Sequence, residues 1–85
     1  MNTSSKDTIM FCLQFIKDNF EEASQRTMCR TWLKTATDTI AKENEGSSDF
    51  VINELKDIDG YLSGANASMT SVDVLTKLDT IFQLL

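Results

Sequence analysis

The sequence contains no histidine and no proline, only three glycines and two cysteines, and no long apolar run. Without histidine the chain lacks the commonest general base, the commonest zinc ligand and the base of every Ser-His or Cys-His nucleophile. Two cysteines alone do not supply the ligand set of a structural zinc site. The acidic residues all fall on polar faces or in loops. We therefore expect a protein that is not an enzyme and that holds no metal or other cofactor.

Apolar character and charge narrow the choice of partners. The longest apolar segment, residues 9–20, is interrupted by charged and amide side chains and falls short of the roughly 20 residues that cross a bilayer. No apolar signal-peptide segment follows the polar residues 1–6. The net charge of -5 at pH 7 repels phosphate backbones and anionic lipids. These observations predict a cytoplasmic protein with neither nucleic acid nor a membrane among its partners.

The length of 85 residues suits one domain, and 41% apolar and 25% charged residues are typical of folded proteins. At this size a single core offsets the conformational entropy of the chain only narrowly. We therefore expect one helical domain, residues 1–85, with tight helix packing or oligomerisation adding to its stability.

Apolar residues recur at helical spacing in four segments, and no segment shows the alternation of a β-strand. The glycines all lie in the middle third of the chain, which suits helices separated by short loops. The sequence predicts an all-α fold, a small four-helix bundle of antiparallel helices in up-down-up-down order. The expected helices cover about residues 5–20, 24–44, 48–62 and 71–85.

Capping residues mark the expected helix ends. Ser4 or Ser5 is placed to cap the first helix. Gly46 is placed to end the second helix in the left-handed conformation. Thr70 and Asp73 form an acidic variant of the capping box at the start of the last helix.

No glycine or proline separates the first two helices, but the apolar stripe changes phase near residues 21–24. Continuing the heptad of the first helix would put Lys34 on the apolar seam and Leu33 off it. We therefore expect a break, with Ser24 as the cap of the second helix. A stutter within one long helix is the alternative.

The apolar stripes predict which side chains form the core. In chain order, the expected core residues are Ile9, Cys12, Leu13, Ile16, Phe20, Met28, Cys29, Trp32, Leu33, Ala36, Ile40, Val51, Leu55, Ile58, Leu62, Val74, Leu75, Leu78, Ile81, Phe82 and Leu85. The last stripe runs to the final residue, so we expect the C-terminus to be docked on the bundle.

The two cysteines, Cys12 and Cys29, lie at similar distances on either side of the predicted turn. In antiparallel helices they would stand at similar height, and a disulfide would form if their Cα atoms came within about 7 Å. The alternative, which we favour, is two buried reduced thiols that act as small hydrophobic side chains.

The first helix is apolar over more than half of its circumference, because Met10, Phe11 and Phe15 lie off its main stripe. If these side chains are exposed, they form an aromatic patch of the kind that marks a protein interface. If they are buried, they pack against the last helix, residues 71–85. The sequence is compatible with both arrangements.

Three cationic residues, Arg26, Arg30 and Lys34, are spaced four apart in a stretch without acidic residues. They would line one side of the second helix, roughly opposite Trp32 and Ala36, so we expect them to face outward. Such a stripe would suit an acidic partner or this protein's own acidic surface in an oligomer. The simpler interpretation is a solvated face that balances nearby acids.

Together these features predict a small non-enzymatic protein that acts by protein-protein interaction, as a regulator, adaptor, inhibitor or immunity-type factor. We expect it to form a homodimer through the helix that bears Phe11 and Phe15. One alternative is a module that binds an apolar ligand among four aromatic side chains: Phe11, Phe15, Trp32 and Phe82. The other is an acidic mimic of nucleic acid, for which a net charge of -5 is modest.

Overall fold

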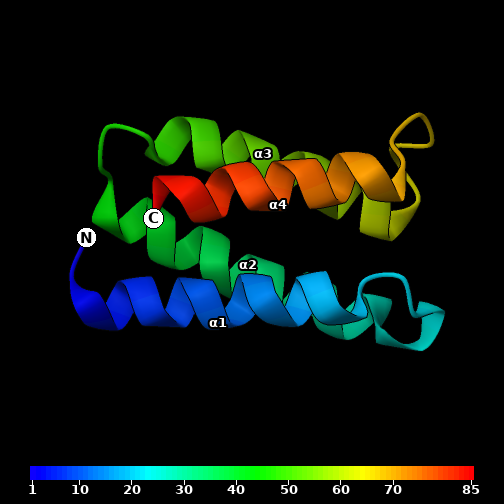
Figure 1. Cartoon of the computed structure of the whole chain (residues 1–85), viewed down its shortest axis with the longest axis horizontal. Helices are drawn as coiled ribbons and strands as arrows, with labels where there is room; N and C mark the ends of the chain where they lie inside the picture. The colour runs from blue at the N-terminus through cyan, green and yellow to red at the C-terminus, as the bar shows by residue number, and fades with distance from the viewer.

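The computed structural model describes residues 1–85 as four α-helices joined by short connections (Figure 1). The helices are α1 (Thr3–Asn19), α2 (Arg26–Glu43), α3 (Ser48–Ser63) and α4 (Ser71–Leu84), and a 3-10 turn, η1 (Ala23–Gln25), precedes α2. Successive helices run in opposite directions, and both chain ends lie at the same end of the bundle. The predicted antiparallel four-helix bundle is confirmed, with every helix end within two residues of its expected position. No helix combines the length and apolarity required to span a bilayer.

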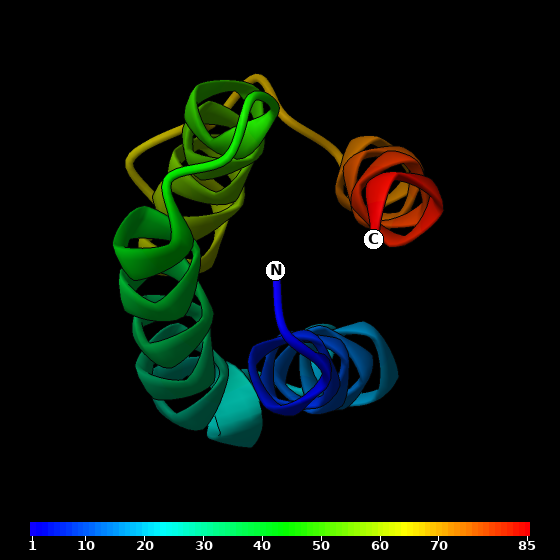
Figure 2. The same ribbon diagram turned by 90° about the vertical axis from the view of Figure 1, so that its left-hand side faces the viewer.

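The helices surround the core in chain order, so that each one packs beside the next (Figure 2). The backbone of α2 lies close to both α1 and α3, whereas α4 approaches its two neighbours less closely. This difference follows from the side chains, because α2 buries the small residues Cys29 and Ala36 while α4 buries the larger Leu78 and Ile81. Interaxial distance depends on the size of the side chains at the contact.

The core consists of sixteen buried apolar side chains. Every residue predicted for the core of α1, together with Phe20, is buried, and so is every one predicted for α3. The helical period determines which residues share a face, so these two stripes were predicted correctly. In α4, the flanking residues Leu75, Phe82 and Leu85 are half-buried and pack against the core, which agrees with a docked C-terminal helix.

One core prediction in α2 is wrong. The side chain of Met28 is 49% exposed. Met28 precedes the buried Cys29 by one residue and is therefore rotated about 100° away from the core stripe. Trp32 is half-buried at the edge of the same stripe.

The capping residues predicted for the start of α1 and for the end of α2 are also wrong. Asn2, not Ser4 or Ser5, caps α1, because its side-chain oxygen accepts a hydrogen bond of 2.8 Å from the backbone N–H of Ser5. Asn44, not Gly46, ends α2 in the left-handed conformation, with φ of 46°. Asparagine tolerates this region better than other residues with a Cβ atom.

The capping box at the start of α4 is confirmed. The backbone N–H of Thr70 donates to the carboxylate of Asp73 over 2.9 Å, and the N–H of Asp73 donates to the hydroxyl of Thr70 over 3.3 Å. Each residue thus satisfies a backbone donor that the helix itself leaves free. Gly64, with φ of 83°, ends α3 at the other side of the connecting loop.

The predicted break between the first two helices is confirmed, so the alternative of one long helix is excluded. Ser24 is not the cap of α2, because it lies inside η1, and the position before α2 is held by Gln25 without a side-chain hydrogen bond. Backbone bonds close the turn instead, from the N–H of Glu22 to the carbonyl of Asn19 and from the N–H of Gln25 to the carbonyl of Glu22. The N–H of Arg26, the first residue of α2, donates to the carbonyl of Ala23, so η1 satisfies one of the donors that the start of a helix leaves free.

Ion pairs fix α4 to its neighbours. The ammonium of Lys77 donates to Glu54 of α3 over 2.8 Å and lies 3.3 Å from Asp57. The hydrogen bond to Glu54 is the largest cause that raises the pKa of Lys77. On the other side, Lys17 of α1 lies 3.3 Å from Asp79 of α4.

Candidate protein-docking site

An aromatic group lies where α1 meets α2. Phe11 and Phe15 are four residues apart on α1 and therefore share one side of that helix. Trp32 of α2 packs against both: its ring centroid lies 5.3 Å from that of Phe11, edge to face, and 5.9 Å from that of Phe15. Such tilted geometries are the favourable ones for aromatic pairs. The two helices thus hold three rings in fixed orientations.

These rings are only partly covered. The side chain of Phe11 is 61% exposed, whereas Phe15 and Trp32 are half-buried against the core. Met28 lies one turn before Trp32 on the same side of α2 and adds its exposed side chain. A single exposed apolar residue is ordinary, but a contiguous group is typical of an interface. We call Phe11, Phe15, Met28 and Trp32 the aromatic surface.

The alternative of burial against α4 is not what the structure shows, because the aromatic neighbour of Phe11 and Phe15 is Trp32 of α2. Phe82 of α4 lies instead beneath the ammonium of Lys17, which is 5.9 Å from the ring centroid. Lys17 follows Phe15 by two residues and points to the opposite side of α1. The four aromatic residues of the apolar-ligand hypothesis therefore do not surround one cavity.

Met10, the third residue of the predicted interface, is exposed but lies apart from the aromatic surface. It is rotated about 100° from Phe11 and shares its flank with Lys17, seven residues on, which reaches α4. The structure thus brings two of the three predicted interface residues together and separates the third.

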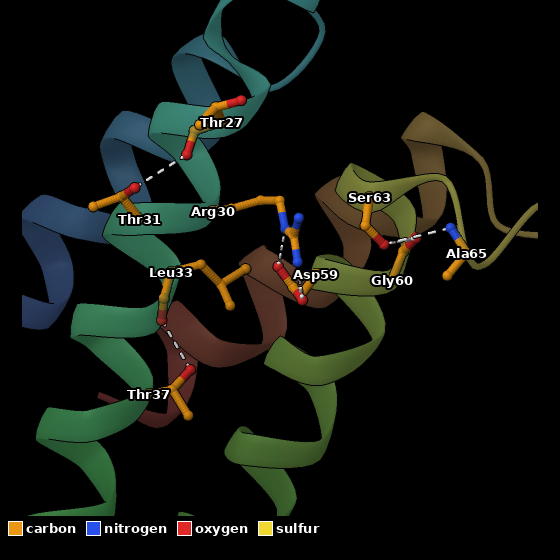
Figure 3. A network of polar contacts seen from close by, with 9 residues as sticks. All are labelled: Thr27, Arg30, Thr31, Leu33, Thr37, Asp59, Gly60, Ser63 and Ala65. Carbon is orange, nitrogen blue, oxygen red and sulfur yellow. Dashed lines mark hydrogen bonds and ion pairs between the residues drawn. The ribbon is translucent and has the colours of Figure 1, made fainter.

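The predicted cationic stripe does not face outward as a unit. The guanidinium of Arg26 lies over the ring of Tyr61 of α3 at 5.2 Å, and its Nε is buried without a hydrogen-bond partner. Arg30 donates two hydrogen bonds, of 2.8 and 3.3 Å, to the carboxylate of Asp59 of α3 (Figure 3). Arg26 is thus half-buried beside α3, contrary to the outward expectation, whereas Arg30 remains exposed while it bonds to α3.

Only Lys34 of the stripe is mostly exposed, at 76% of its side chain, and it pairs with Asp38 one turn later over 3.0 Å. The hydrogen bond from Arg30 to Asp59, followed by the charge of that carboxylate, raises the pKa of Arg30. The arrangement agrees with the simpler interpretation, in which these cations balance nearby acids.

The remaining reactive side chains are kept out of solvent. Cys12 and Cys29 are both buried free thiols, as favoured from the sequence, and burial is the largest cause that raises the pKa of each. A raised pKa leaves little of the nucleophilic thiolate. No three cysteine or carboxylate side chains are gathered closely enough to hold a metal ion.

Met28 is a member of the aromatic surface that the sequence had predicted for the core. Its angular position relative to the stripe that contains Cys29 and Leu33 was available from the sequence and would have placed it at the edge. The apolar-ligand hypothesis had grouped Trp32 with Phe11 and Phe15, and the structure brings these three rings together while Phe82 lies beside Lys17.

Comparison of the chain with protein-family models, with curated proteins and with solved structures gives no significant match. A small helical bundle is compatible with many unrelated functions. The aromatic surface and the charged flank of α2 are therefore the features from which a function can be proposed.

Proposed function

We propose that this protein is a non-catalytic, cytoplasmic protein-interaction module that associates with a second copy of itself through the aromatic surface. The observation that supports the proposal best is the exposure of Phe11, whose ring is already held in place by Trp32. An aromatic side chain that is fixed before binding loses little conformational freedom when a partner covers it. Large aromatic residues of this kind are enriched among interface hot spots.

The geometry of α1 and α2 suits a two-fold interface. In a symmetric dimer the same patch faces itself, so the aromatic surface of one copy lies against that of the other. A standard interface covers about 800 Å² per partner, roughly a sixth of the 4943 Å² surface of the chain. Helices of 17 and 18 residues make a face about 26 Å long and about 20 Å wide, which can supply such an area.

Burial of this face would leave few polar groups without partners. The aromatic surface carries no charge, and the threonines that follow Trp32 on its side of α2 already use their hydroxyl protons. Thr35 donates to the carbonyl of Thr31 and Thr39 donates to the carbonyl of Thr35. A second copy would meet threonine methyl groups and aromatic rings there, and these two hydroxyl donors would lose no hydrogen bond to water.

The test is the sedimentation of the purified protein over a range of concentrations, with and without reductant. We expect a dimer that is insensitive to reductant, and we expect Phe11→Glu to be a monomer because the dimer would bury an unpaired carboxylate. The matched control is Val72→Glu, which places the same charge on α4 at a side chain that is 67% exposed. This variant should remain a dimer.

Circular dichroism of both variants establishes that the helices are intact. A wild-type monomer at every concentration would contradict the proposal, and so would equal dissociation of the two variants. Within the same class, the role of regulator, adaptor, inhibitor or immunity-type factor depends on further partners. A partner search that compares the wild type with Phe11→Glu would separate ligands of the aromatic surface from others.

A further inference from the structure

A polar groove of about 540 Å³ runs between α2 and α3, on the flank of α2 away from the aromatic surface. Its only apolar lining residue is Leu33, and threonines of α2 line the same wall. Figure 3 shows one end of this groove, where Arg30 reaches from α2 to Asp59 of α3. The groove is therefore lined by charged and hydroxyl-bearing side chains, whose aliphatic stems supply most of its exposed area.

The groove carries an excess of positive charge. Three cations line it, namely Arg30, Lys34 and Lys56, together with two acids, Asp38 and Asp59. Both acids are already bonded, Asp59 to Arg30 and Asp38 to Lys34. Lys56 has no ion-pair partner, so the balance of three cations and two acids is a local charge of +1 in a chain whose net charge is -5.

The register of the two helices places Lys34 and Lys56 at similar height. α2 and α3 are antiparallel, and Arg30 lies opposite Asp59. Lys34 is one turn, about 6 Å, further along α2, and Lys56 is three residues, about 4.5 Å, back along α3. Glu54 and Asp57 of α3 bond to Lys77 of α4, and Asp59, one turn from Lys56, bonds to Arg30, so none of these acids pairs with Lys56. The two lysines thus lie at similar height on the two walls of the groove.

We propose that this groove binds a carboxylate-rich segment of a partner protein, held between Lys34 and Lys56. Two ammonium groups on facing walls repel each other, and a carboxylate placed between them relieves that repulsion. Lysine suits this task because its flexible stem carries a compact charge with three rotatable donors. The only ammonium contact of Lys34 within the chain is the single hydrogen bond to Asp38.

The backbone of such a segment could also form a hydrogen bond with the wall of the groove. The hydroxyl of Thr37 donates to the carbonyl of Leu33 over 2.8 Å, which leaves its oxygen free to accept a hydrogen bond from a peptide N–H. The cations stand on opposite walls and at successive turns of α2, and this spread suits a ligand with several acceptors along its length better than one small anion. The groove and the aromatic surface lie on different flanks, so one copy of the chain can use both.

The test is calorimetric titration of the protein with a glutamate-rich synthetic peptide at low ionic strength. In the double variant Lys34→Gln/Lys56→Gln we expect the peptide to bind about fivefold to tenfold more weakly, from the loss of two exposed charge pairs. The matched control is Lys6→Gln/Lys42→Gln, which changes the net charge equally at exposed sites outside the groove. We expect the control to lose less than about twofold.

Amide chemical shifts from a parallel titration should change mainly in residues 27–38 and 56–59, which span the groove. Equal weakening in the two double variants, or no binding of the peptide to the wild type, would overturn the proposal. Displacement of the peptide by inorganic phosphate, at an ionic strength at which sodium chloride does not displace it, would assign the groove to small anions instead.

Sedimentation distinguishes this proposal from the preceding one. Lys34→Gln/Lys56→Gln should sediment as the wild type does, and a change in its oligomeric state would mean that the groove holds a second copy and would overturn the inference. Phe11→Glu should bind the peptide as the wild type does. If the protein proves to be a monomer, the proposal for the groove still stands. If the peptide does not bind in the groove, the proposal of a dimer still stands.

Discussion

The two buried thiols make the stability of this protein sensitive to alkaline pH. Cys12 and Cys29 are fully buried, and that burial raises the pKa of each above its ordinary value of 9.0. In the unfolded chain both thiols ionise near pH 9, whereas in the folded protein they ionise only at higher pH. The unfolded state therefore releases protons, and it becomes more favourable as the pH rises.

We expect the free energy of unfolding to fall as the pH rises above about 8.5, and to fall less steeply in Cys12→Ala/Cys29→Ala. The double variant should also be less stable at neutral pH, since its smaller side chains leave space in the core. Urea denaturation at several pH values below 10 measures both effects. This window excludes Lys77, whose contribution is lost only above its ordinary pKa of 10.5. Parallel pH curves for the two proteins would contradict the prediction.

The end of α2 shows that the left-handed residue of a helix end need not be the nearest glycine, whereas α3 does end on one, Gly64. Ile40 is the last buried residue of α2, so a longer helix would bury nothing more. Asn44 ends the helix one turn later, with its N–H donating to the carbonyl of Ile40. Gly46 follows in the loop without a positive φ, and only Gly64 among the glycines has one.

Alanine substitutions at Gly64 and Gly46 should therefore have different effects on the free energy of unfolding. Gly64→Ala is expected to lower the free energy of unfolding by about 1 kcal/mol, because a Cβ atom is strained at φ of 83°. Gly46→Ala is expected to leave it unchanged or to raise it by roughly 0.5 kcal/mol, since no atom lies within 4 Å of the added Cβ. Thermal and urea unfolding of the two variants compares them directly. Equal destabilisation would show that the end of α3 is assigned wrongly.

The position of α2 between α1 and α3 depends on its small buried residues. Ala36→Leu is expected to lower the free energy of unfolding by about 1–3 kcal/mol, because the added atoms force two closely packed helices apart. Ala41→Leu makes the same change on the exposed side of α2 and should alter stability by less than about 0.5 kcal/mol. If the free energy of unfolding of Ala36→Leu equals that of the wild type, the packing around Ala36 leaves space for a larger side chain.

The elements also show what the sequence could and could not predict. The apolar period identifies the buried stripe of α3, Val51, Leu55, Ile58 and Leu62, without knowledge of any other helix. The flanks of a helix carry no such signal, because their surroundings depend on which helix lies beside them. The bundle with the opposite circular order would satisfy the same stripes. The bond from the exposed Arg30 to Asp59 of α3, and the flank of α1 on which Trp32 packs, therefore depend on the arrangement of the helices and not on the stripe of one helix.

At the scale of the whole molecule, added salt should act in opposite directions on the two proposed interactions, because the net charge is -5 whereas the groove is locally positive. Two copies repel each other, so added salt should strengthen a dimer held by uncharged rings. The same salt should weaken the binding of an acidic peptide to the groove, because that contact consists of exposed charges. Sedimentation and calorimetry at low and high sodium chloride measure the two responses. A dimer that weakens with salt would indicate that ion pairs hold it together and that the aromatic surface does not.

Trp32 is the only tryptophan of the chain and stands at the boundary between the core and water, beside the exposed ring of Phe11. Its indole fluorescence therefore reports two events that differ in direction. Unfolding removes the neighbouring rings and shifts the emission to longer wavelength, whereas a second copy laid over the aromatic surface excludes water and shifts it to shorter wavelength. The protein thus carries an intrinsic optical probe at its own proposed interface, and its association can be followed in solution without a label.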